Sequence, residues 1–67
     1  MLIYINNEVR EFSADPTLFD LLHELQLAEK RGLAVAINNQ VIPKKAWVVS
    51  TLSENDKVTI IQATQGG

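Results

Sequence analysis

Residues 17–25 have the sequence TLFDLLHEL, which is the amphipathic helical pattern of this chain. The leucines at positions 18, 21, 22 and 25 follow the i, i+3, i+4, i+7 spacing that puts side chains on one face of a helix. Thr17 precedes Asp20 by three residues, a capping-box variant in which each side chain binds a free backbone amide at the helix start. We therefore expect a helix that starts after Thr17, ends near Leu27 and buries its leucine face.

Extended apolar segments lie on both sides of the predicted helix. Leu2–Ile5 is followed by Asn6-Asn7 and then by the strand-like segment Glu8–Phe12. Two adjacent asparagines tolerate the positive φ angles of a tight turn, so these segments predict a hairpin. Beyond the helix, Leu33–Ile37 is closed by a second Asn-Asn pair before Val41-Ile42. The sheet is therefore expected to receive strands from both halves of the chain.

The remaining segment predicts a turn, a short helix and a last strand. Pro43 cannot donate to a central ladder, so the chain after Ile42 is expected at an edge or in a turn. Lys44–Trp47 indicates a short helical turn that places Trp47 over one end of the core. Lys57–Gln62, which follows a turn at residues 54–56, is typical of a final strand.

The order of these elements predicts the architecture. Sixty-seven residues leave room for one domain. Two strands, one amphipathic helix and then further strands favour a mixed sheet wrapped around that helix. We therefore predict an α+β protein with the ubiquitin-like β-grasp layout, in which four to five strands surround one main helix. Residues 1–62 are expected to form the domain, and residues 63–67 a flexible C-terminal tail.

The alternation of side chains along strands gives this sheet two apolar faces. One set is expected to face the helix: Ile3, Ile5, Leu33, Val35, Ile37, Val58 and Ile60. The opposite set has no second helix to cover it: Leu2, Tyr4, Ala34, Ala36, Thr59 and Ile61. An exposed apolar patch on a small protein often marks a partner surface, and we assign that role to Leu2, Tyr4, Ala34, Ala36 and Ile61. The alternative is that these are scattered surface residues of ordinary strands.

Composition excludes several classes of function. The chain has no cysteine and one histidine, which excludes disulfides and thiol nucleophiles and disfavours a metal site. A net charge of −2 argues against nucleic-acid binding, and no apolar run approaches the ~20 residues that span a bilayer. The 46% of apolar residues is typical of a packed globule rather than a disordered chain. The simplest expectation is a soluble cytoplasmic protein without nucleic-acid or membrane partners.

The sequence ends with Gly66-Gly67, preceded by the uncharged residues Ala63-Thr64-Gln65. Glycines have no Cβ and leave a terminal carboxylate accessible in a narrow channel. Fully extended, residues 63–67 could reach roughly 17 Å from the domain. A slim neutral arm with a bare carboxylate suits insertion into the active site of another protein. The alternative is an ordinary frayed terminus.

Other conspicuous residues favour structural roles. His23 has no nucleophile near it in the pattern, which favours a solvent-facing helix residue over a general base. Trp47 is expected to pack in the core rather than to stack on a ligand. Phe19 lies off the leucine face, and the pattern leaves open whether it contacts a partner or the first hairpin. No active site of the chain's own is predicted.

Residues 33–44, LAVAINNQVIPK, followed by Trp47 and the terminal glycine pair, resemble the sulfur carrier proteins of thiamine biosynthesis. That family consists of β-grasp proteins of this length with an AVAVN-x-x-VVP-[RK]-x-x-W segment, an acidic turn before the last strand and a Gly-Gly end. The resemblance covers essentially the whole chain. Asn55 stands where a glycine is frequent in the acidic turn, and asparagine is the next best residue for a left-handed turn.

The resemblance implies a function in which this chain is a covalent carrier rather than an enzyme. It implies that an adenylating enzyme, using ATP and Mg²⁺, activates the carboxylate of Gly67. A cysteine desulfurase would supply sulfur as a persulfide to form a thiocarboxylate, which thiazole synthase would accept. Gly66 and Gln65 would give the tail access to these enzymes. No cofactor or metal is expected to be bound by the chain itself.

Three alternatives remain open from the sequence. A β-grasp sulfur carrier could serve molybdopterin synthesis or tRNA thiolation through the same terminal chemistry. A ubiquitin-like protein modifier would attach Gly67 to a lysine of a target instead of receiving sulfur. A plain β-grasp interaction domain would make no use of the tail.

Overall fold

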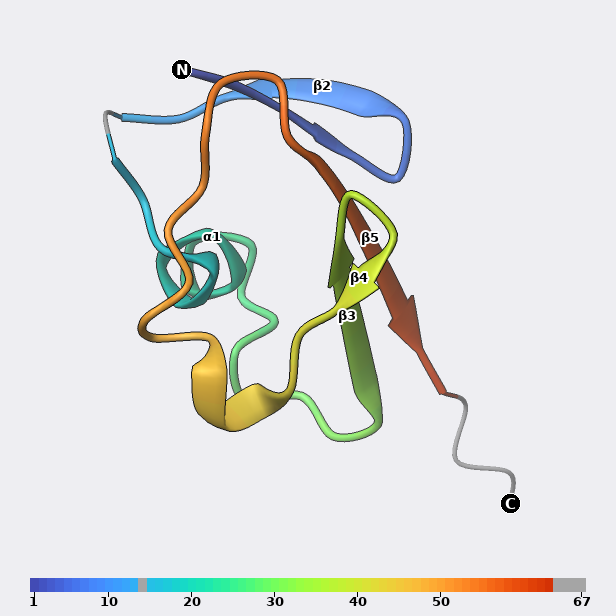
Figure 1. Ribbon diagram of the computed structural model, residues 1–67. Coiled ribbons are helices and arrows are strands. Elements are labelled where there is room, and N and C mark those ends of the chain that lie inside the picture. The colour runs from blue at the N-terminus through green and yellow to red at the C-terminus, as the bar shows by residue number, and fades with distance from the viewer. Residues whose placement is uncertain (14, 64–67) are drawn as a thin grey trace.

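Helix α1 (Leu18–Glu24) lies on one side of a sheet that curves around it (Figure 1). The computed structural model describes residues 1–13 and 15–63, and the elements below belong to these residues. The five strands are β1 (Leu2–Ile5), β2 (Glu8–Glu11), β3 (Leu33–Ile37), β4 (Gln40–Val41) and β5 (Lys57–Gln62). Their order across the sheet is β2-β1-β5-β3-β4. β1 and β5 run parallel and the other neighbours antiparallel, which confirms the predicted mixed sheet of the β-grasp layout.

Two asparagine pairs close the two hairpins with the same backbone geometry. Asn6 and Asn7 have φ angles of 49° and 71°, and Asn38 and Asn39 have the same two values. Positive φ at both central residues is the requirement of a two-residue type I′ turn. Ile5 therefore pairs with Glu8, and Ile37 pairs with Gln40 across the turns. The prediction of tight Asn-Asn turns is confirmed.

The start of α1 is closed by the predicted capping box. The Asp20 amide donates to Thr17 Oγ1 at 3.1 Å, and the Thr17 amide donates to Asp20 Oδ2 at 2.9 Å. The loop from the other half of the chain holds the same end, because the Leu18 amide donates to the Ser50 carbonyl at 2.7 Å. A helix of this length is marginal on its own, so these contacts and the core stabilise it.

The helix ends at Glu24, so the prediction of an end near Leu27 was three residues too long. Gln26 has a φ angle of 63° and takes the left-handed conformation that usually belongs to glycine at a helix end. The Leu27 amide donates to the Leu22 carbonyl at 2.7 Å, and the Gln26 amide donates to the His23 carbonyl at 3.0 Å. These two bonds form a Schellman motif, which satisfies the last carbonyls of the helix. No helix among the described residues is long and apolar enough to cross a membrane.

The hydrophobic core lies between α1 and the inner face of the sheet. Three helix leucines, Leu18, Leu21 and Leu22, are fully buried, and Leu25 is half-buried. The predicted inner-face residues of the strands are buried or half-buried against them: Ile3, Ile5, Leu33, Val35, Ile37, Val58 and Ile60. The assignment of side chains to the inner face is confirmed.

The segment after β4 closes one end of the core. The 3-10 helix η1 (Lys44–Ala46) follows Pro43, as expected. Trp47 comes directly after it with 2% of its surface exposed, and its Nε1–H donates to the Ile42 carbonyl at 3.0 Å. Trp47 is therefore a core residue. Asn55, in the turn before β5, has a φ angle of 69°, which confirms the expected left-handed turn.

The leucine face of α1 gives the first testable prediction. Leu22→Ala is expected to lower the free energy of unfolding by about 2–5 kcal/mol, because it deletes a fully buried side chain. Urea unfolding followed by the fluorescence of Trp47 measures the change. The exposed neighbour His23 provides the matched control, since His23→Ala removes a side chain from the opposite face. An unchanged midpoint for Leu22→Ala would show that this face does not stabilise the core.

Candidate functional site

Strand β5 carries the C-terminal segment and lies in the middle of the sheet (Figure 1). Its last residue, Gln62, is opposite Leu33 of β3. One residue further, the Ala63 amide donates to the Gly32 carbonyl at 2.8 Å. The backbone is thus bound to the sheet through Ala63. The predicted attachment residue Gly67 and the predicted access residues Gly66 and Gln65 lie outside the described residues.

The face of the sheet opposite α1 contains the residues predicted as a partner surface. We call it the open face. Leu2 and Tyr4 have 41% and 36% of their surface exposed, and Ile61 has 61%. Ala34 is also exposed, whereas Ala36 is half-buried among its neighbours. The helix leaves this face uncovered.

The strand register divides the open face into two parts. Tyr4 is opposite Lys57, at the start of β5. Ala34 is opposite Ile61, near its end, and Ala36 is opposite Thr59. Ile61 lies four positions after Lys57 along β5, which corresponds to about 13 Å at a strand rise of roughly 3.3 Å. The predicted surface is therefore two groups, and the group with Ala34, Ala36 and Ile61 lies at the end of β5 that leads into the tail.

Two valines extend the open face and were not assigned to it from the sequence. Val9 is opposite Tyr4 and has 52% of its surface exposed. Val41 is opposite Ala36 and has 70% exposed. A two-residue Asn-Asn turn fixes which residues pair in the β1–β2 hairpin and in the β3–β4 hairpin. The length of these turns was therefore the sequence signal that could have placed Val9 and Val41 on the open face.

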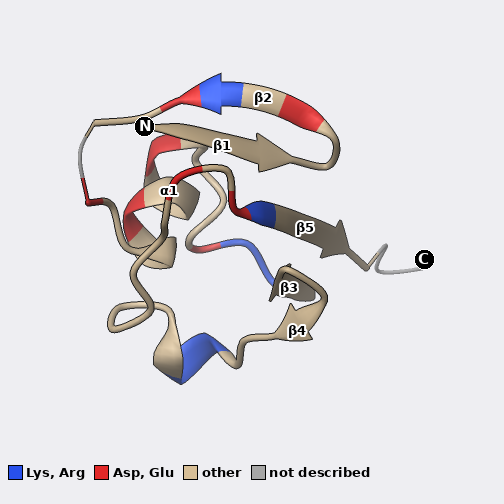
Figure 2. Cartoon of the chain, turned by 45° about the horizontal axis from the view of Figure 1, so that its top comes forward, with Lys and Arg blue, Asp and Glu red and all other residues tan. Residues whose placement is uncertain are grey.

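The open face has little charge. Figure 2 shows β1 and β3 without charged residues, and Lys57 is the one charged residue of β5. Glu11, opposite Leu2, and Lys57, opposite Tyr4, border the part of the face that is remote from the tail. The part at the tail end is formed by small and aliphatic side chains with Thr59. Such a surface suits apolar contact with a partner.

The helix side of the molecule contains the other residues singled out by the sequence. Phe19 has 37% of its surface exposed, and its ring stacks on that of His23 with 6.1 Å between centroids. His23 is exposed, as predicted. Both residues belong to α1, which lies on the side of the sheet opposite to the open face. They are therefore separate from the tail end of β5.

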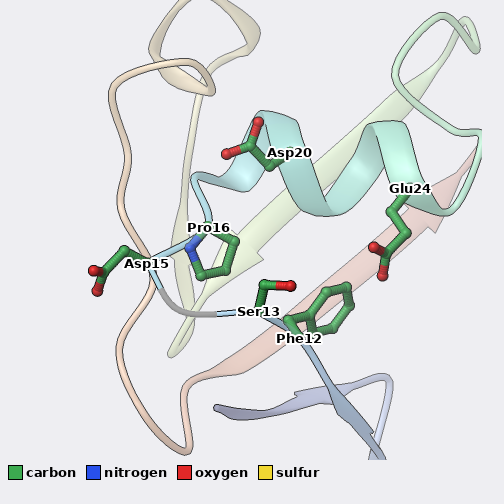
Figure 3. A pocket seen from close by; sticks show the side chains of 6 residues that line it. All are labelled: Phe12, Ser13, Asp15, Pro16, Asp20 and Glu24. Atoms are coloured by element: carbon green, nitrogen blue, oxygen red, sulfur yellow. The ribbon is translucent and has the colours of Figure 1, made fainter.

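A hollow of about 200 Å³ near the start of α1 is the site drawn in Figure 3. It is lined by Phe12, Ser13, Asp15, Pro16, Asp20 and Glu24. The Asp20 carboxylate already accepts the Thr17 amide of the capping box, and Asp15 points away from the other two carboxylates (Figure 3). Among the residues that the structure describes, no group of three potential metal ligands occurs. The hollow lies on the α1 side and does not reach the open face.

A mixed sheet around one helix, with the C-terminal segment carried by the central strand, defines a β-grasp protein of the ubiquitin-like class. Comparison with known proteins narrows this class. The family model described as the ThiS family matches residues 3–67. The chain belongs to the ThiS family.

Two curated relatives match over all 67 residues of this chain. The sulfur carrier protein ThiS of Escherichia coli (strain K12) is 30% identical, and the match covers all of both proteins. A thiazole synthase of Paramagnetospirillum magneticum is 36% identical, and the match covers 20% of that longer protein. This chain therefore spans about a fifth of the length of the second relative.

Solved structures agree with the fold. The crystal structure of the thiamine biosynthesis protein ThiS from Geobacter metallireducens has a TM-score of 0.83 at 22% identity, with all of both chains covered. The solution structure of a thiamine biosynthesis protein from the same organism has a TM-score of 0.81 at 22% identity, covering all of this chain and 88% of that one. At this identity the likeness is evidence for the fold alone.

Proposed function

We propose that this chain is a sulfur carrier of thiamine biosynthesis, with the carboxylate of Gly67 as its point of attachment. The observation that carries the proposal is the family match, which runs from residue 3 through the terminal glycine pair at residue 67. The relative matched over its whole length is named a sulfur carrier protein. In this proposal the carboxylate of Gly67 is the group on which the carrier chemistry would take place.

The first step of the proposed chemistry is activation of that carboxylate. A carboxylate is a poor electrophile, so an adenylating enzyme would transfer AMP from ATP to Gly67 and release pyrophosphate. Mg²⁺ bound by that enzyme would balance the phosphate charge. The product is a mixed anhydride in which AMP is a good leaving group. This chain would be the substrate of the step and not its catalyst.

The second step would exchange AMP for sulfur. The terminal sulfur of a cysteine persulfide, supplied by a cysteine desulfurase, would attack the acyl carbon and expel AMP. The resulting acyl persulfide would then be cleaved by a second thiol, which leaves a disulfide on the donor and a thiocarboxylate on Gly67. Because this chain has no cysteine, no internal thiol would compete for the activated acyl group.

The acceptor of the sulfur would be thiazole synthase. Support comes from the relative of that name, whose sequence includes a segment similar to the whole of this chain. A carrier and an acceptor that meet repeatedly gain from being joined, because linkage raises their effective concentration. We infer that the acceptor for this carrier is a thiazole synthase of the same kind.

The tail and the open face would have different tasks in these encounters. Gly66 and Gln65 would pass through the narrow entrance of each partner's active site. The part of the open face with Ala34, Ala36 and Ile61 would dock against the partner beside that entrance, because it lies at the tail end of β5. Leu2 and Tyr4, with Val9, would contact a partner large enough to cover the whole face.

The alternative functions are less well supported. A carrier for molybdopterin synthesis or tRNA thiolation would use the same terminal chemistry, but the matched relatives carry the names of thiamine proteins. A protein modifier would need a target lysine in place of a sulfur donor. The choice between thiocarboxylate and isopeptide products is open to direct measurement.

Deletion of Gly67 tests the site of activation. The wild-type protein, given ATP and an adenylating enzyme of this pathway, is expected to form an AMP adduct. With a persulfide donor and a thiol it is expected to exchange one oxygen for sulfur. Intact-mass spectrometry reads both products, and neither is expected after Gly67 is deleted. A lysine-linked product in place of the thiocarboxylate would favour the modifier function. Modification of the shortened chain would place the reactive group elsewhere.

Gly66→Ala tests the need for a slim tail. The added methyl group restricts the backbone and widens the chain one residue from the carboxylate. We expect unchanged thermal stability and a loss of adenylation rate on the order of 100-fold, as for a misplaced reacting group. Thr64→Ala is the matched control, since it shortens a side chain further from the carboxylate. Equal rates for Gly66→Ala and the wild type would mean that the channel is wide.

Ala34→Glu tests docking at the open face. The side chain points to solvent in the free protein, so the melting temperature is expected to stay within a few degrees of the wild type. Burial of an unpaired charge against the adenylating enzyme is expected to weaken binding at least tenfold, measured by calorimetry. Ala34→Ser, which adds a small polar group without charge, is the control.

A truncation that lacks Gly66 and Gly67 gives the reciprocal result. It is expected to retain most of the affinity for the adenylating enzyme while losing all chemistry. Wild-type affinity in Ala34→Glu, together with loss of binding in the truncated chain, would place recognition in the tail instead.

A further inference from the structure

The two edges of β5 are held very unequally. On one side, β3 pairs with β5 from Val58 to Gln62, and the Ala63 amide continues this pairing to Gly32. On the other side, β1 pairs only with Lys57 and Val58, because the chain turns away into β2 at Asn6. If strand pairing were the only contact, the half of β5 that leads to the tail would be bound along the β3 edge alone.

The side chain of Asn6 takes the place of the missing strand. Its Oδ1 accepts the Ile60 amide at 2.8 Å, and its Nδ2 donates to the Ile60 carbonyl at 3.2 Å. The Asn6 backbone amide also donates to the Val58 carbonyl at 2.9 Å. The backbone of Asn6 therefore binds Val58, and its side chain binds Ile60, two residues further along the same edge of β5. One carboxamide therefore satisfies both polar groups of Ile60 that face the β1 edge. Beyond Ile60, no described residue continues pairing along this edge.

We propose that Asn6 is a positioning residue for the C-terminal tail: its carboxamide fixes the strand at Ile60 and thereby holds the backbone in place up to Ala63, where the tail begins. The proposal rests on the proposed function in one respect, namely that the tail enters a partner's active site. A strand held along both edges at Ile60 gives the tail a rigid base only three residues before Ala63. A rigid base lowers the entropy lost when the tail is inserted, which improves binding rather than the chemical step.

The second hairpin contains a matched comparison within the same molecule. Asn38 occupies the same turn position as Asn6 and has the same φ angle of 49°. Its Oδ1 accepts the Lys57 amide at 3.0 Å, and its Nδ2 donates to Asp56 Oδ1 at 3.0 Å. Asn38 thus fixes the start of β5, whereas Asn6 fixes the end that leads to the tail. Each side chain makes two hydrogen bonds, which join Asn6 to Ile60 and Asn38 to Lys57 and Asp56.

Glycine is the substitution that separates the side chain from the turn, because it accepts a positive φ angle without strain. We therefore compare Asn6→Gly with Asn38→Gly, and with Asn7→Gly as a turn control. The first measurement is amide hydrogen exchange of the free protein by NMR. In Asn6→Gly the exchange of the Ala63 amide, which is bonded to the Gly32 carbonyl and not to Asn6, is expected to accelerate about tenfold. The other two variants are expected to leave it unchanged within about twofold.

The second measurement is adenylation kinetics with the carrier as the varied substrate. Asn6→Gly is expected to raise KM about tenfold with kcat changed by less than about twofold, whereas Asn38→Gly leaves both unchanged. Equal effects of Asn6→Gly and Asn38→Gly on Ala63 exchange or on KM would overturn the proposal, because they would report general loosening of the sheet. Unchanged Ala63 exchange in Asn6→Gly would also overturn it. Failure of the wild type to be adenylated would overturn the proposed function instead, since the exchange rates need no enzyme.

Discussion

Strand β5 holds the sheet together, since it is the only described strand that joins the β1–β2 hairpin to the β3–β4 hairpin. It reaches the first strand of the chain by the parallel pairing of Tyr4 with Lys57 and of Ile5 with Val58. This pairing closes almost the whole length of the chain, so it carries a large loss of conformational entropy on folding. The hydrophobic core compensates for that loss, because Val58 lies fully buried beneath α1 with Ile3 and Val35. The C-terminal segment therefore follows the central strand of the described sheet.

The single helix has a second consequence for function. α1 covers one face of the sheet, and its three leucines Leu18, Leu21 and Leu22 are fully buried against that face. The opposite face is left to solvent with aliphatic side chains such as Ile61 and Val41, which a free monomer gains nothing by exposing. This chain thus combines two features: an uncovered apolar face, proposed above as a docking surface, and beside it the strand that leads toward the C-terminal segment. Both depend on the same sheet, but they use different atoms.

Asparagine side chains add the precision that so small a core does not supply. Asn6 and Asn38 permit the left-handed turns and, at the same time, bind the two ends of β5. Asn55 allows the turn that leads into that strand. Polar contacts at the strand ends are worth little individually in solvent. Their value here is geometric, because they fix where a strand begins and ends.

The sequence alone determined the elements and their faces. The leucine spacing of α1, the capping box at Thr17 and Asp20 and the Asn-Asn turns are local patterns, and short-range sterics and hydrogen bonding enforce them wherever they occur. The sequence also indicated the family, because its motif and terminal glycines are continuous along the chain.

Only the tertiary structure decided how distant segments meet. It ended the helix at Glu24, since the Schellman bonds hold Gln26 in the left-handed conformation, which a glutamine in the sequence does not predict. It split the open face into two groups, because the parallel register of β1 and β5 sets Tyr4 beside Lys57 and away from Ile61. It also brought Asn6 to Ile60 across a separation of 54 residues, a contact that no local rule specifies. Register and long-range contact depend on the packing of the whole sheet, which is why they could not be read from the order of residues.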